Sequence, residues 1–68
     1  MDKYEEAQAL QFSGRAMKRI WADMVEDGYG ETQAAQGLFD AASDRITRSW
    51  MLFDEIQAED LAELEGRQ

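Results

Sequence analysis

"DGYGE", Asp27–Glu31, is the clearest interruption of the helical pattern in this sequence, and the predicted architecture follows from it. It holds two of the five glycines of the 68-residue chain, and proline occurs nowhere. The segments on either side are rich in Ala, Leu, Met, Gln, Glu and Arg, which are good helix formers. Glycine often ends a helix because it adopts left-handed backbone conformations at little cost. The stretch therefore predicts a turn over residues 28–31, between a helix over about residues 2–27 and a second over about residues 32–57.

Before this turn, apolar and small residues recur at helical spacing. The members of the stripe are Leu10, Gly14, Met17, Trp21 and Met24. On a helix they cover an arc of roughly 100–140°, the expectation for a helix packed on one side. Phe12 is the exception, because it falls near the middle of the polar face. Phe12 is expected to be either an ordinary exposed apolar residue or, with Ala9 and Ala16, part of a small second apolar patch that binds a partner.

The second helix has a wider apolar face. Its seam residues follow the alternating spacing of four and three that is typical of helix–helix packing. They are Ala35, Phe39, Ala42, Ile46, Ser49, Phe53 and Ile56. Leu38 and Leu52 widen this face on one side and Trp50 on the other, to roughly 180° against the ~100° of an ordinary surface helix.

One neighbouring helix cannot cover such an arc. We therefore predict an all-α fold, an antiparallel helical hairpin that pairs with a second copy into a dimeric four-helix bundle. Five residues are predicted to form the apolar face for self-association or for another partner. They are Phe12, Leu38, Trp50, Met51 and Leu52.

Two boundaries of the second helix remain open. The seam weakens after Ile56, so residues 58–65 are expected to form a weak or separate short helix. Within "AASDR", residues 41–45, Ser43 is a residue type that caps helices, and a break there would give a compact three-helix domain. No glycine or proline forces a turn at that point, so the hairpin is favoured.

A helix-turn-helix DNA-binding regulator is the functional alternative that goes with three helices. A turn near residues 40–43 would place Arg45 and Arg48 on a helix that faces DNA. However, Phe39 replaces the usual turn glycine, and a formal net charge of −8 opposes binding to phosphate. Nucleic acid is therefore a disfavoured partner.

Acidic residues outnumber basic ones by 15 to 7, and a hairpin gathers nine of the fifteen acids at one end. The start of the first helix, which carries Asp2, Glu5 and Glu6, would lie beside the acidic end of the second, with no base between them. The acidic pole predicted to bind a partner consists of Glu55, Glu59, Asp60, Glu63 and Glu65. Acids near a helix C-terminus oppose its dipole and repel one another, so the arrangement costs stability. It indicates docking on a basic protein surface, with a solvated acidic tail as the alternative.

Composition disfavours several other classes of function. The chain has neither His nor Cys, so we expect no enzyme, no metal site and no cofactor. No apolar run approaches the roughly 18 residues of a membrane span, so no membrane interaction is expected. Three acids within the first ten residues are unlike a signal peptide, which predicts a cytoplasmic protein.

These patterns predict a protein-binding module, an acidic helical inhibitor or adaptor that occupies a basic surface of its protein partner. In architecture alone, the layout resembles small dimeric helical-hairpin regulators of plasmid or phage type. A helix-turn-helix regulator and a structural assembly subunit are the alternatives.

Overall fold

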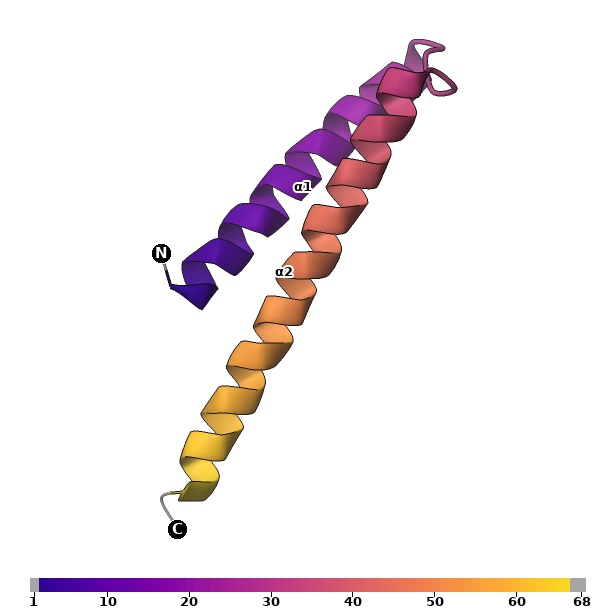
Figure 1. Cartoon of the computed structure of the whole chain (residues 1–68). Helices are drawn as coiled ribbons and strands as arrows, with labels where there is room; N and C mark the ends of the chain where they lie inside the picture. Colours follow the sequence, from indigo (N-terminus) through magenta and orange to yellow (C-terminus); the bar gives the residue numbers. More distant parts are fainter. Residues whose placement is uncertain (1, 67–68) are drawn as a thin grey trace.

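The computed structural model describes residues 2–66, which form two helices, α1 (Lys3–Glu26) and α2 (Gln33–Gly66). The helices run antiparallel side by side, joined by a short turn (Figure 1). The all-α helical hairpin is therefore confirmed. The three-helix alternative is wrong, because α2 passes through Ser43 and Asp44 without a break.

The turn lies at the glycine-containing stretch that the sequence indicates, and it begins where α1 ends. Gly28 has a φ of 90°, and its N–H donates to the carbonyl of Val25 at 3.1 Å. The N–H of Tyr29 donates to the carbonyl of Met24 at 2.7 Å. This pair of bonds is the Schellman motif, which satisfies the last carbonyls of a helix and requires a left-handed residue.

Side chains cap the start of both helices. The Asp2 carboxylate accepts a hydrogen bond from the N–H of Glu5 at 2.8 Å. The Thr32 hydroxyl accepts from the N–H of Ala35 at 3.2 Å and donates to the carbonyl of Tyr29 at 2.7 Å. Each cap satisfies an N–H that has no partner within its helix, which fixes where the helix begins.

The end of α2 differs from the expectation. Residues 58–65 continue the same helix to Gly66 and do not form a separate one. Lys3, the first residue of α1, contacts Glu59, so α2 extends beyond α1 after that point (Figure 1). We call residues 60–66 the overhang. Its seven residues project about 10 Å at 1.5 Å per residue.

Small residues form the seam between the helices. The buried residues of the described chain are Ala7, Gly14, Ala35, Ala42 and Ser49. A Cβ built on Gly14 would lie 2.7 Å from Ile46 Cγ1 and 3.0 Å from the Ala42 carbonyl oxygen. The two backbones therefore approach closely at the middle of the hairpin. As a result, the largest fully buried side chain among the described residues is that of Ser49.

The large apolar side chains flank this seam and are only partly covered. The rings of Trp21 and Phe39 lie 4.8 Å apart near the turn, and Tyr4 and Phe53 make an edge-to-face contact at 6.0 Å near the other end. Trp50 nevertheless remains 59% exposed. The chain exposes 5380 Å², whereas a compact protein of 7.8 kDa exposes about 4,400 Å². Its radius of gyration of 16.3 Å likewise exceeds the ~11 Å of a compact chain of this length.

Candidate protein-binding surfaces

The predicted acidic pole lies along the second half of α2. All five of its residues, Glu55, Glu59, Asp60, Glu63 and Glu65, are exposed. The structure corrects one feature of the prediction, because a base lies among them. Lys3 Nζ donates a hydrogen bond to Glu59 Oε1 and lies 3.5 Å from Glu55 Oε2. Lys3 thus divides the pole into a part beside α1, which contains Glu55 and Glu59, and the overhang beyond it.

The same contact perturbs the ammonium group. The hydrogen bond from Lys3 to Glu59, together with the charge of that carboxylate, raises the pKa of Lys3 above its ordinary value of 10.5. Glu55 acts in the same direction. A nearby negative charge favours the charged form of the ammonium group. Because these side chains are about half exposed, solvent screens the pair, and its contribution to stability is small.

The overhang carries two exposed leucines that sequence reasoning did not single out. Leu61 and Leu64 are 61% and 60% exposed, and together with Gln57 and Asp60 they line a shallow depression. The signal was present in "EDLAELEG", where the two leucines stand three residues apart and thus share one side of a helix. The overhang therefore joins apolar side chains to acidic ones on a single exposed helix end.

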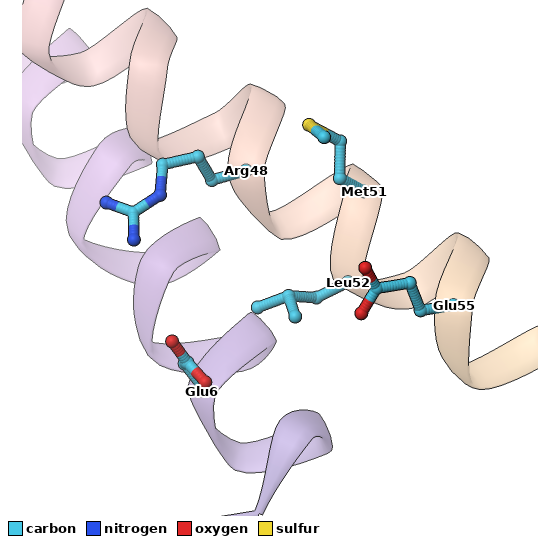
Figure 2. A pocket seen from close by; sticks show the side chains of 5 residues that line it. All are labelled: Glu6, Arg48, Met51, Leu52 and Glu55. Carbon is cyan, nitrogen blue, oxygen red and sulfur yellow. The ribbon is translucent and has the colours of Figure 1, made fainter.

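A second surface lies on the flank of the hairpin around Leu52. Its depression is lined by Glu6 from α1 and by Arg48, Met51, Leu52 and Glu55 from α2. Figure 2 shows Leu52 directed toward α1, with Arg48 on one side along α2 and Glu55 on the other. Leu52 is half-buried there. The flank thus places an apolar side chain between a cationic and an anionic one.

The five apolar residues predicted as one contact face do not lie together. Leu38 and Leu52 are half-buried on the same flank of α2, whereas Trp50 lies 200° around that helix from Leu52. Met51, at 60% exposure, is turned away from α1 in Figure 2. Phe12 is 79% exposed on the polar face of α1. Helical geometry separates them into two flanks and two outer sides, so they cannot act as a single patch.

Within residues 2–66, no group of three or more acidic side chains is placed to hold a metal ion. Neither α1 nor α2 combines the length and the apolar character needed to cross a membrane. No protein-family model, curated protein sequence or solved structure matches this chain. The overhang and the Leu52 flank are therefore the features from which its function is inferred.

Proposed function

We propose that this chain is a non-enzymatic protein-binding module that acts through the overhang of α2, as an inhibitor or adaptor. The observation that carries the proposal is the chemistry of that helix end. From residue 49 to residue 66, α2 carries six acids and no base. Leu61 and Leu64 are exposed among them. An acidic helix with exposed leucines suits a partner that offers a shallow apolar surface bordered by Lys and Arg.

The position of the overhang supports a docking role. It extends past α1, so a partner can reach it from several sides (Figure 1). Acidic residues near the C-terminus of a helix oppose its dipole, and no basic residue lies in the last turn of α2. A basic partner would relieve this unfavourable electrostatic arrangement. Charge of one sign would also speed the encounter with a partner of the other sign.

The proposal includes self-association into a homodimer. Among residues 2–66 the buried seam holds only Ala, Gly and Ser, and the chain exposes about 1,000 Å² more than a compact protein of its mass. Stable protein interfaces bury roughly 1,200–2,000 Å² in total, counting both partners. Two such chains therefore have sufficient surplus surface for a standard interface.

The two alternatives are separated by different observations. The helix-turn-helix regulator receives no support from the structure, because α2 is continuous through residues 40–43 where its turn would lie. A structural assembly subunit would use the same apolar flanks as a dimer. Light scattering distinguishes it, because a subunit of an assembly would form particles much heavier than twice the chain mass of 7.8 kDa.

The proposal is tested by retention of proteins from the organism that encodes the chain. We expect the wild type to retain a basic protein that is lost when Leu61 and Leu64 are changed to Ser. The loss should also follow when Asp60, Glu63 and Glu65 are changed to Ser. A matched variant with Glu5, Glu26 and Glu31 changed to Ser loses the same number of acids elsewhere and should retain it. Equal recovery with all four proteins would reject the overhang as the docking surface.

A further inference from the structure

The charges of α2 are arranged with opposite signs on the two sides of Leu52. Arg45 and Arg48 precede it by seven and four residues, and Glu55 and Glu59 follow it by three and seven. On an α-helix these spacings return to the same side. We call these five residues the Leu52 stripe.

Contacts within the hairpin show where the stripe lies. Arg45 Nη1 donates to Ser13 Oγ at 3.4 Å, and Glu55 lies 3.5 Å from Lys3. Arg48, Leu52 and Glu55 line one depression (Figure 2). The stripe therefore runs along a single flank of the hairpin, where α1 partly covers Arg45 and Leu52 and leaves Arg48, Glu55 and Glu59 exposed.

We infer that a second copy of this chain occupies the stripe, with the two α2 helices antiparallel about a two-fold axis at Leu52. In a two-fold interface, a contact from residue i to residue j is repeated from j to i. Arg45 then lies level with Glu59 of the second copy, Arg48 lies within one residue of the level of Glu55, and Leu52 meets its own counterpart. This inference rests on the homodimer of the proposed function and specifies which surface forms it.

The charge pattern selects this arrangement over the two nearest alternatives. A parallel pairing would place arginine beside arginine and glutamate beside glutamate. An antiparallel pairing centred on Arg45 would bring Leu38 against Leu52, but it would also place the two Arg45 side chains together at the axis. In that register Glu55 and Glu59 would face Ala35 and Glu31, so neither would meet a base. Like charges in contact disfavour both alternatives.

The charged side chains of the stripe can form further ion pairs with a second copy of the chain. A single ammonium, that of Lys3, serves both Glu55 and Glu59. Arg48 forms an ion pair with Asp44, at a long 4.0 Å. The side chains of Arg48, Glu55 and Glu59 are each more than half exposed. A second copy can therefore add contacts without displacing those within the chain.

This dimer leaves the leucine side of the proposed docking surface accessible. In the antiparallel register, Glu63 in the overhang lies level with Ala41 of the second copy, so this one acid lies beside the dimer interface. Leu61 and Leu64 lie about 140–200° around the helix from Glu59. They therefore point away from the second copy and remain available to another protein.

Charge reversal tests the register. We expect the wild type to have twice the chain mass of 7.8 kDa by light scattering. Glu55→Arg with Glu59→Arg, and separately Arg45→Glu with Arg48→Glu, should each give a monomer, because every cross-copy pair becomes repulsive. Mixing the two variants should restore a dimer that contains one chain of each.

Matched reversals away from the stripe control for net charge. Glu26→Arg with Glu31→Arg repeats the first change of charge, and Arg15→Glu with Arg19→Glu repeats the second. Both controls should remain dimeric. If the wild type is dimeric and all the reversed variants are too, the register is overturned while the homodimer stands. A monomeric wild type overturns both, but leaves the retention experiment on the overhang as an independent test of docking.

A cysteine test requires no charge reversal and no loss of the Lys3 contacts. The chain contains no Cys, so one introduced thiol is unique. Under oxidation, Leu52→Cys should give a disulfide-linked dimer, since residue 52 meets its own counterpart at the axis. Thr47→Cys, about 140° around the helix from Leu52, should stay unlinked. Equal crosslinking of the two variants contradicts the register.

Discussion

At the scale of single residues, the hairpin depends on the absence of a side chain at Gly14. A methyl group there would meet the Ala42 carbonyl oxygen at 3.0 Å, and a backbone oxygen cannot move aside as a flexible side chain can. Replacing Gly by Ala inside a helix gains about 0.8–1.0 kcal/mol in helix propensity. Overpacking of a tight contact costs about 1–3 kcal/mol. The steric cost therefore exceeds the gain.

We predict that Gly14→Ala lowers the free energy of unfolding by about 1 kcal/mol. Gly37→Ala is the matched control, since nothing lies within 4 Å of a Cβ at that position of α2. It should raise the free energy of unfolding by about 1 kcal/mol. Urea titration at equal protein concentrations measures both. Stabilisation by both substitutions would contradict the close approach at Gly14.

Lys3 gives a residue-scale prediction about pH. Because its pKa is raised in the folded chain, its contribution to stability is fully present below about 10.5 and is lost as the pH rises through the raised value. We predict that NMR of the Lys3 side chain gives a midpoint above 10.5, and that Glu59→Gln lowers it toward that value. Glu31→Gln, remote from Lys3, should leave it unchanged. An identical midpoint in all three proteins would show that the contact with Glu59 does not persist in solution.

At the scale of elements, the turn and both helix starts were predictable because each rests on a local signal. Gly28, Thr32 and Asp2 act on backbone groups within a few residues of themselves. The end of α2 was not predictable from the seam. Its apolar spacing stops near Ile56 because α1 begins opposite that region and does not extend past it, whereas α2 continues through Ala, Glu and Leu, which favour helices. A packing pattern reports the length of the neighbour, not that of the helix itself.

The same reasoning explains which parts of the candidate surfaces were missed. Leu61 and Leu64 belong to no seam, so the spacing of seam residues does not indicate them. The contact of Lys3 with Glu59 joins residues 56 positions apart, and only the register of the two helices brings them together. The excess of acids is visible in the composition. Which acids lie beside Lys3 and which lie in the overhang depends on where α1 begins, and the composition does not give that.

The turn supplies the prediction at the element scale. Gly28 has a φ of 90°, which an L-residue with a Cβ adopts at a cost of about 1–2 kcal/mol. Gly28→Ala should therefore lower the free energy of unfolding by about that amount. Gly28→Asn should cost less, because Asn tolerates the left-handed region. Chemical denaturation compares the two, and an alanine variant as stable as the wild type would contradict the Schellman geometry.

At the scale of the whole molecule, the distribution of charge matters more than its total. Two copies of a chain with net charge −8 repel one another at long range. An antiparallel pairing about Leu52 offsets this repulsion locally, because it brings the arginines of each copy to the glutamates of the other. It also separates the two overhangs, which would otherwise concentrate their acids at one end. Self-association and an exposed acidic end are therefore compatible in one particle.

The stability of the whole molecule should consequently depend on its concentration. Within residues 2–66 a single hairpin fully buries only small side chains and leaves the large apolar ones on its flanks partly exposed, so more apolar surface leaves water when a second copy covers it. Mass action then stabilises the folded dimer as the concentration rises. We predict that the thermal midpoint measured by circular dichroism increases by several degrees between about 1 and 100 μM chain. For the dimer-breaking reversals of the Leu52 stripe, the midpoint should be lower and independent of concentration. A sharp wild-type transition whose midpoint stays constant over this range would mean that the single hairpin is stable by itself and that its exposed flanks are not covered by a second copy.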